Sequence, residues 1–248
     1  MIGLNLAFMA LIKVVLKMRD YIKTGFILAA FMIASALLVS VVYNFVQSTI
    51  EATEFSNVLQ AVEKVLEDPM TGEYLITNIP KDKESLDSKI WKEDPSGVLY
   101  STPKSAKVYS PAYKFAEGDK EIYVLNISGV GYGGDVKAIA SFVKNKDGIK
   151  LNKIEITDYS QETPGLGARI GEEQVKRRFY PIPEQGLLSG VKVDRDVGAN
   201  IPQNEVEEYK NQGIIKTNDV MTGSTITSRA VTNAINTAVE FLKTEGVI

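Results

Sequence analysis

The chain has 248 residues and a formal net charge of -3, and 44% of its residues are hydrophobic. These values suit one membrane anchor followed by one globular domain, and the absence of a basic block excludes a nucleic-acid partner. Because the chain has no cysteine and no histidine, thiolate-bound iron–sulfur clusters, His-ligated haem, Ser–His catalysis and the usual zinc sites are excluded. An electron carrier of this composition needs an organic cofactor; we assign no catalytic residue and no metal ligand, although a carboxylate site for a hard cation stays open.

Residues 25–45 carry no charge and are long enough to cross a membrane as one helix. Basic residues precede this span and acidic residues follow it: Lys13, Lys17, Arg19 and Lys23 before it, and Glu51, Glu54 and Glu63 after it. The positive-inside rule then predicts a single-pass protein of the cell membrane, with a cytoplasmic N-terminus and an extracytoplasmic main domain. A cleaved signal peptide is disfavoured, because the apolar run is too long and no small-x-small cleavage site follows.

Residues 1–24 are predicted to be a cytoplasmic or interfacial segment. The apolar run 1–17 is interrupted by Lys13, so we expect no second span there, and Met18 is an alternative start. Residues 46–69 are predicted to be a stalk helix that ends at Pro69, because apolar side chains recur at helical spacing. We assign 70–248 to the extracytoplasmic domain.

Within this domain, 121–127, 136–143 and 150–157 are predicted strands, and the turn Asn145-Lys146-Asp147-Gly148 predicts a hairpin between the last two. Residues 181–204 are rich in Pro and Gly and are predicted to be a loop. A last helix is expected over 228–243. The predicted fold class is α+β, with a twisted, largely antiparallel sheet and packed helices.

Several hydroxyl residues and a glycine stand before this last helix, in the run Asp219-Val220-Met221-Thr222-Gly223-Ser224-Thr225-Ile226-Thr227-Ser228. A helix start offers unpaired N–H groups and a positive dipole, so it can bind phosphate. A plain Ser or Thr N-cap is the commoner explanation of such a run, and spacing alone favours it.

Two further segments stand out. Glu162-Thr163-Pro164-Gly165-Leu166-Gly167 contains a Pro-Gly turn, which explains Pro164 and Gly165 but not the whole run. Residues 129–134 fit the spacing G-x-G-x-x-G, yet a dinucleotide fingerprint must open a helix and a strand is predicted next. That segment is therefore predicted to be a glycine-rich turn between strands.

The three segments together resemble the FMN-binding domain found in the G subunit of Rnf electron-transport complexes and in the C subunit of the sodium-translocating NADH:quinone reductase. The flavinylation motif of this family runs Asp-x-x-Ser/Thr-Gly-Ala-Thr, and Ser224 here replaces the alanine. The resemblance implies covalent FMN, held by a phosphoester on Thr225. It also implies further cofactor-binding residues: Thr222, Gly223, Ser224, Thr227, Glu162, Thr163, Gly165, Leu166, Gly131 and Tyr132.

One position departs from the family pattern, because Ser160 stands where the family often has histidine. Among nearby cations, Lys176, Arg177 and Arg178 are predicted to form a solvated helix face, although one of them, or Lys216, is a candidate to neutralise the phosphate or the reduced flavin. Asp219 is expected to shape the motif loop or to aid recognition by the enzyme that attaches FMN.

The resemblance to the Rnf family implies an electron relay between ferredoxin and NAD branches, coupled to Na⁺ or H⁺ transport. The implied partners are the other subunits of the complex, including a second flavinylated membrane subunit, and a flavin transferase that installs FMN from FAD with magnesium. Alternatives are the C-type quinone-reductase subunit, a stand-alone flavinylated extracytoplasmic electron-transfer protein, and an anchored scaffold without a redox role.

Overall fold

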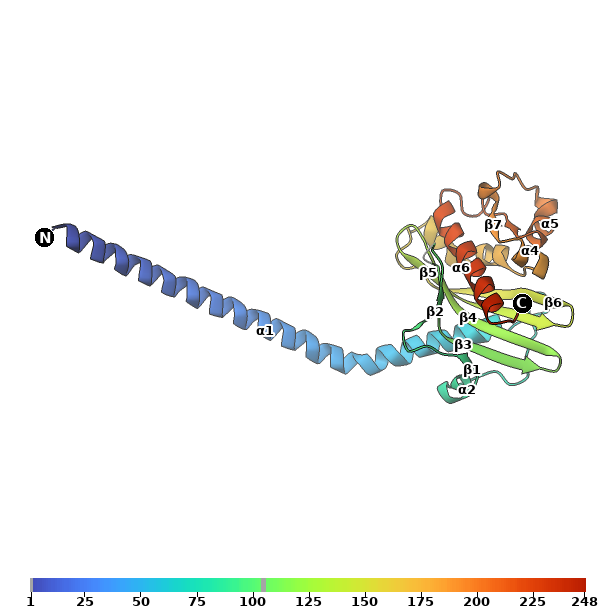
Figure 1. The fold of residues 1–248 in the computed structure, drawn as a ribbon, viewed down its shortest axis with the longest axis horizontal. Helices are drawn as coiled ribbons and strands as arrows, with labels where there is room; N and C mark the ends of the chain where they lie inside the picture. The colour runs from blue at the N-terminus through green and yellow to red at the C-terminus, as the bar shows by residue number, and fades with distance from the viewer. Residues whose placement is uncertain (1, 104–105) are drawn as a thin grey trace. The chain divides into compact units, whose positions relative to one another are not determined.

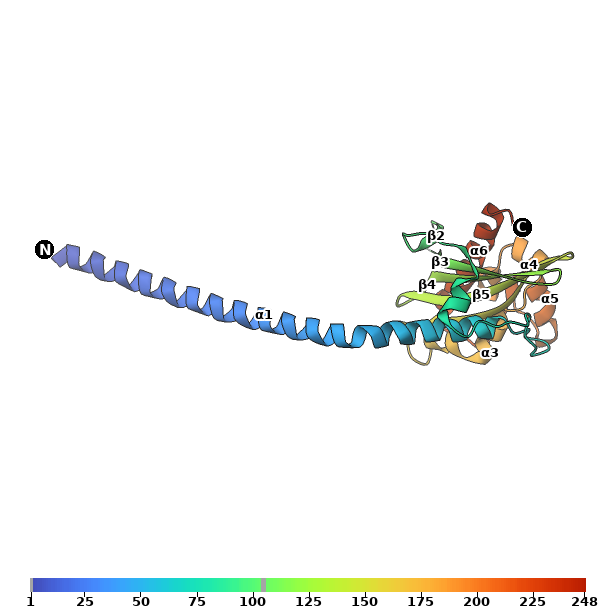
Figure 2. The same cartoon turned by 90° about the horizontal axis from the view of Figure 1, so that it is seen from below.

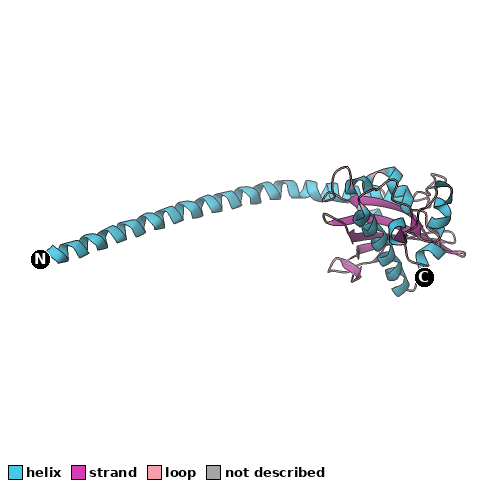
Figure 3. Cartoon of the chain, turned by 90° about the horizontal axis from the view of Figure 1, so that it is seen from above, coloured by secondary structure: helices cyan, strands magenta, loops and turns pink. Residues whose placement is uncertain are grey.

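The computed structural model describes residues 2–103 and 106–248, and these divide into two compact units, Met1–Glu54 and Phe55–Ile248. The first unit is the greater part of one continuous helix, α1 (Ile2–Val65) (Figure 3). Among the described residues, Tyr21–Gln47 is the one helical segment long and apolar enough to cross a membrane, and its most apolar window is not buried. It contains the whole of the predicted span 25–45.

The predicted membrane helix and the predicted stalk helix are successive parts of one helix, because α1 runs without a break from one into the other. No Gly or Pro stands between Phe45 and Val65 to end the helix. The side chains of residues 2–18 lie outside the described part of the structure, and so do the predictions that concern Lys13, Lys17 and Met18.

The second unit is built on an antiparallel sheet of six strands in the order β1-β3-β4-β5-β6, with β2 also paired to β3 (Figure 1). The strands are β1 (Ile90–Lys92), β2 (Val98–Ser101), β3 (Lys107–Glu117), β4 (Lys120–Val130), β5 (Asp135–Asn145) and β6 (Gly148–Asp158). The short helix α2 (Lys83–Asp87) precedes the sheet. The predicted α+β class with a largely antiparallel sheet is confirmed.

The three predicted strands are β4, β5 and β6, each longer than expected. Asn145 pairs with Gly148 across the predicted hairpin turn. β1, β2 and β3 were not predicted. Pro111 lies inside β3 at a shift of register against β4, where a residue without an N–H group is tolerated but the sequence pattern of a strand is broken.

Both faces of the sheet are covered, because side chains of the central strands β4 and β5 alternate between two cores. Leu125 and Phe142 face the core that includes the long last helix α6 (Thr225–Thr244), whereas Ile122 and Ile139 face the core that includes the last turns of α1. Figure 2 shows α6 on one side of the strands and the end of α1 on the other. The helical spacing predicted around Val62 is therefore the spacing of a packed face.

α6 lies so close to β4 that only a glycine fits at the contact point, Gly129. A Cβ atom on Gly129 would lie 2.0 Å from the carbonyl oxygen of Ala230, far inside contact distance. This contact fixes α6, and with it the segment before α6, against the end of β4.

The prediction that 181–204 is a loop is wrong in part. The segment contains the short helix α4 (Glu184–Leu188), the strand β7 (Lys192–Val193) and a 3-10 turn, η3 (Asp194–Asp196). β7 pairs in parallel with β8 (Ile214–Ile215). Pro183 stands at the N-cap of α4, so this proline begins a helix where composition suggested a loop. A further 3-10 turn, η4 (Gln203–Glu205), and the helix α5 (Val206–Asn211) follow.

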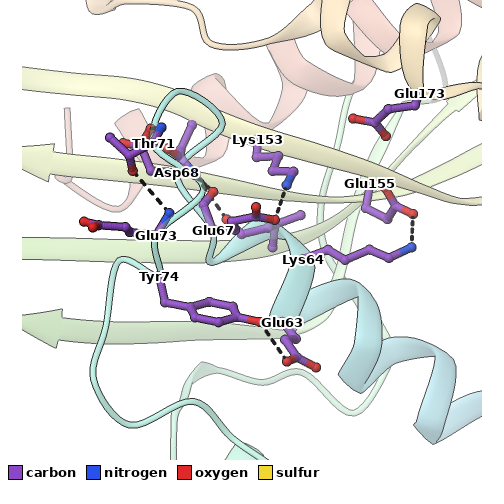
Figure 4. Close-up of polar contacts among 12 residues, drawn as sticks. Glu63, Lys64, Glu67, Asp68, Thr71, Glu73, Tyr74, Lys153, Glu155 and Glu173 are labelled. Atoms are coloured by element: carbon purple, nitrogen blue, oxygen red, sulfur yellow. Dashed lines mark hydrogen bonds and ion pairs between the residues drawn. The ribbon is translucent and has the colours of Figure 1, made fainter.

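A network of ion pairs joins the end of α1 to β6 and to the short helix α3 (Glu173–Lys176). Lys64 donates to Glu155 at 2.8 Å, and Lys153 donates to Glu67 at 2.7 Å (Figure 4). Glu155 also binds Lys176, which is only 7% exposed. The predicted solvated face is therefore wrong for Lys176, because its charge is paired inside the domain.

We predict that Gly129→Ala destabilises the domain. The added methyl group must push α6 away from β4, and overpacking of this kind costs about 1–3 kcal/mol. Chemical denaturation of the detergent-solubilised protein measures the loss, with Ser101→Ala at the exposed end of β2 as control. A Gly129→Ala variant as stable as wild type would show that α6 is not held at this distance.

We also predict a loss of stability in acid that depends on Glu173. Burial raises the pKa of Glu173, but hydrogen bonds from Arg177, Lys176 and Tyr180 outweigh burial and hold this pKa at about 2, below its ordinary 4.5. A carboxyl group with a lowered pKa stabilises the folded state above its unfolded pKa, and this contribution is lost as the pH falls from about 4.5 to about 2.

Thermal unfolding between about pH 6 and about pH 2 tests this prediction. Glu173→Gln should be less stable than wild type near neutral pH and should lose less stability on acidification, whereas the surface variant Glu208→Gln should follow the wild-type curve. Parallel curves for Glu173→Gln and wild type would contradict the assignment.

Candidate functional site

The glycine-rich segment 129–134 forms the turn between β4 and β5. Val130 pairs with Asp135 at the strand ends, and the N–H of Gly131 donates to the carbonyl of Gly134 at 2.8 Å. The segment leads into a strand and not into a helix, as predicted. The turn lies directly against the chain that follows β6, since a Cβ atom on Gly133 would be 1.8 Å from the carbonyl oxygen of Gln161.

Glu162, the first residue of the run 162–167, binds this turn through its side-chain carboxylate. Its side chain is buried, at 4% exposure. Its Oε1 accepts hydrogen bonds from the backbone N–H groups of Tyr132 at 2.8 Å and Gly133 at 3.3 Å. Its Oε2 accepts a hydrogen bond from the hydroxyl of Thr227 at 2.6 Å. One carboxylate therefore joins all three segments singled out in the sequence.

Two glycines make room for this carboxylate. A Cβ atom on Gly131 would lie 2.1 Å from Oε1 of Glu162, and one on Gly167 would lie 2.3 Å from Oε2. Both positions are inside contact distance, so any side chain there would displace Glu162. The glycines are explained by the close approach of a buried acid, and not by turn geometry alone.

Residues 219–224 form a tight turn that leads directly into α6, and residues 225–228 are the first turn of that helix. Ser224 accepts at its carbonyl from Ser228 and donates its own N–H to Met221, and Gly223 has a positive φ of 85°. α6 begins at Thr225, three residues before the predicted start at Ser228. Ser224 stands at the N-cap position but makes no side-chain capping bond, so the plain cap that spacing favoured is not formed by this residue.

The run 162–167 and this turn lie side by side. A Cβ atom on Gly223 would be 3.9 Å from Cδ2 of Leu166. Thr222 and Gly223 are exposed, and Thr225 is half-buried in the first turn of α6. Thr163 and Gly165 are also exposed, and Gly165 has a positive φ of 75° in the turn.

Comparison with known proteins agrees with this geometry. Residues 131–240 match the FMN-binding domain family. A solved structure, described as an RnfG subunit of an electron transport complex from Thermotoga maritima, is 34% identical, covers 76% of this chain and 96% of its own, and superposes with a TM-score of 0.56. This chain belongs to the FMN-binding domain family.

Two curated relatives are similar over different lengths. The G subunit of the proton-translocating ferredoxin:NAD(+) oxidoreductase complex of Clostridium ljungdahlii is 31% identical over 133 residues, and the match spans 53% of this chain and 60% of that protein. The G subunit of the ion-translocating oxidoreductase complex of Aliivibrio fischeri is 26% identical over 230 residues, which is 90% of each chain.

The exposed surface around Glu162 fits the cofactor of an FMN-binding family member. Large apolar side chains in or beside the three segments face solvent: Val130 at 45%, Tyr132 at 73%, Leu166 at 47% and Ile226 at 45% exposure. Such side chains offer flat apolar surface for an isoalloxazine ring. The start of α6 offers N–H groups and a positive dipole for a phosphate.

The residues predicted as flavin neighbours differ in what they can contact. Tyr132, Leu166, Thr163 and Gly165 are exposed, whereas Glu162 is buried with its oxygens bound to its own chain. Glu162 therefore holds the segments of the candidate site together and does not offer its carboxylate to a ligand. Ser160, at the position of the family histidine, donates its hydroxyl to Asp158 at 2.9 Å and so closes the end of β6.

Sequence reasoning missed Asp194, which binds the chain just before the segment 219–228. This carboxylate is 1% exposed and accepts from the hydroxyl of Thr217 at 3.0 Å and from the N–H groups of Thr217 and Asn218 at 3.2 and 3.1 Å. Asp194 lies in the part of 181–204 that was predicted to be a loop. No local pattern links it to residues 23 and 24 positions further on.

We predict that Glu162→Ala loosens the site and destabilises the domain by about 1–3 kcal/mol, because buried donors lose their acceptor. Glu162→Gln should be milder, since its amide oxygen can still accept from Tyr132 and its amide nitrogen can donate to Thr227. Hydrogen exchange at 131–134 and 225–228, together with the melting temperature, measures both effects; Glu172→Ala, at an exposed site, is the control. Unchanged exchange in Glu162→Ala would contradict the role of this carboxylate.

Proposed function

We propose that this chain is the G-type electron-carrier subunit of an Rnf-type ion-translocating oxidoreductase, with FMN attached to Thr225. The observation that carries the proposal is the meeting of the three segments around Glu162, which sets Thr225 at the start of α6 beside exposed apolar side chains. The similarity to the G subunits of two such complexes supports it.

The attachment would be a phosphoester on the side-chain oxygen of Thr225. In the installing reaction a separate flavin transferase supplies FAD: the Thr225 oxygen bonds to the phosphorus of the FMN half, the pyrophosphate P–O bond breaks, and AMP leaves. The hydroxyl proton passes to a base of the transferase. No change of oxidation state occurs, and magnesium in the transferase would neutralise the phosphates.

When bound, the flavin accepts and returns one or two electrons. The residues of this chain hold and shield it: Tyr132, Leu166 and Ile226 would contact the ring, and the first turn of α6 would face the phosphate. Glu162 would keep these elements in position through its hydrogen bonds to the turn at Tyr132 and to Thr227. The apolar side chains would exclude water from the part of the ring that they contact, and an uncovered edge would serve the next carrier.

We infer the location of this relay from the uncharged span 25–45, which lies within Tyr21–Gln47, and from the charges beside it. Arg19 and Lys23 precede the span and Glu51 and Glu54 follow it, so we propose a cytoplasmic N-terminus and an extracytoplasmic FMN domain. Partners would be the other subunits of the complex, one of them also flavinylated. A tether in the membrane raises the effective concentration of the domain near these partners.

The test is the intact mass of the full chain, purified in detergent after coexpression with a flavin transferase. Wild type should gain the mass of FMN less one water and keep flavin absorbance after denaturation, and Thr225→Val should show neither. Thr222→Val removes the nearest exposed hydroxyl of the motif and should still gain mass. Folded wild-type protein without added mass would contradict covalent attachment and favour the scaffold interpretation.

A further inference from the structure

We propose that Arg178 is a positioning residue for flavinylation, because it holds the carboxylate of Asp219 and so fixes the turn that presents Thr225. This inference rests on the proposed attachment of FMN to Thr225. It concerns a cation that neither the family motif nor local spacing assigns to the site.

The contact links two segments that are distant in sequence. Arg178 lies in the 3-10 turn η2 (Arg177–Phe179), which follows the run 162–167 and α3. Its Nη2 donates to Oδ2 of Asp219 at 2.8 Å, across 41 residues of sequence. The side chains are 18% and 35% exposed, so Arg178 is mostly covered while Asp219 lies at the surface. Lys216 Nζ lies 3.8 Å from the same oxygen and adds a second positive charge.

Arg178 projects from a base that is itself fixed. Lys176, two residues earlier, is buried and ion-paired with Glu155 on β6 and with Glu173 at 3.1 Å. Phe179, the next residue, is fully buried in the core. The backbone that carries Arg178 is therefore fixed on both sides, and only the side-chain rotamers of Arg178 and Asp219 need to be ordered when the bond forms.

The turn that carries Thr225 is fastened at both ends by other acids. Asp194 binds Thr217 and Asn218 at its beginning, and Glu162 binds Thr227 at its end. Asp219 is the first residue beyond the Asp194 anchor, where the chain starts toward the exposed positions Thr222 and Gly223. Its hydrogen bond to Arg178 connects this exposed stretch to η2.

The geometry separates positioning from direct binding of phosphate. The guanidinium contributes a hydrogen bond to Asp219, so its charge is already compensated by a residue of the motif. If Arg178 acts through Asp219, removing either partner gives the same defect, and removing both adds nothing. If Arg178 instead binds the incoming phosphate, the effects of the two substitutions are independent and add.

The experiment measures the initial rate at which the purified full chain, expressed without a transferase, gains FMN mass from FAD, magnesium and added transferase. Arg178→Gln should lower the maximal rate about tenfold without changing the KM for FAD, since misplacing an acceptor slows a reaction without weakening the other substrate. Asp219→Ala, which removes the acceptor, should match it, and the double variant should be no slower. Arg178→Lys should recover most of the rate, because one donor is enough for the observed single bond.

Arg177→Gln is the matched control. Arg177 is the neighbouring residue in the same 3-10 turn, its side chain is 69% exposed, and it pairs with Glu173, away from the motif. This variant should be modified at the wild-type rate. The melting temperatures of Arg178→Gln and Arg177→Gln should both stay near that of wild type, because a single ion pair near the surface contributes little to global stability.

The outcomes separate this inference from the proposed function. Wild type that gains no mass would refute the attachment of FMN to Thr225 and this inference with it. Wild type that is modified, with Arg178→Gln or Asp219→Ala equally fast, would overturn the inference and leave the attachment intact. Additive effects of the two substitutions would also overturn it, since they would assign Arg178 to a separate contact.

Discussion

The site depends on one buried carboxylate. Glu162 is withdrawn from solvent, and a charge in that position is tolerated only when hydrogen bonds compensate it. The donors are the backbone of Tyr132 and Gly133 and the hydroxyl of Thr227, which belong to two other segments of the chain. None of these segments is long enough to hold its own conformation, so their shared acceptor orders them together.

This constraint explains why three weak sequence signals belong together. A Pro-Gly turn, a G-x-G-x-x-G spacing and a hydroxyl-rich helix start each have a common local explanation. In the structure, Gly131 and Gly167 are small because a Cβ atom at either would meet the Glu162 carboxylate, and Thr227 is a hydroxyl residue because it donates to it. Gly131, Gly167 and Thr227 therefore share one structural cause, the carboxylate of Glu162.

Sequence reasoning recovered what is local and missed what is not. The β5–β6 hairpin and α6 follow from patterns within about 20 residues, and both are present. Asp194 and Lys176 were not recovered, because their partners lie 23 and 21 residues away and no periodicity marks them. The four-residue helix α3 is also too short for its pattern to show that Lys176 faces inward.

The division of labour in the site suits a carrier whose cofactor is attached covalently, as proposed. Glu162 and Asp194 form hydrogen bonds that hold the backbone, and the large side chains that face solvent, Tyr132, Leu166 and Ile226, are hydrophobic. Noncovalent binding of a flavin would require a deep site, because exposed apolar contacts give little affinity. A bond to Thr225 removes that requirement, so the surface can stay shallow and one edge of the ring can remain open for electron exchange.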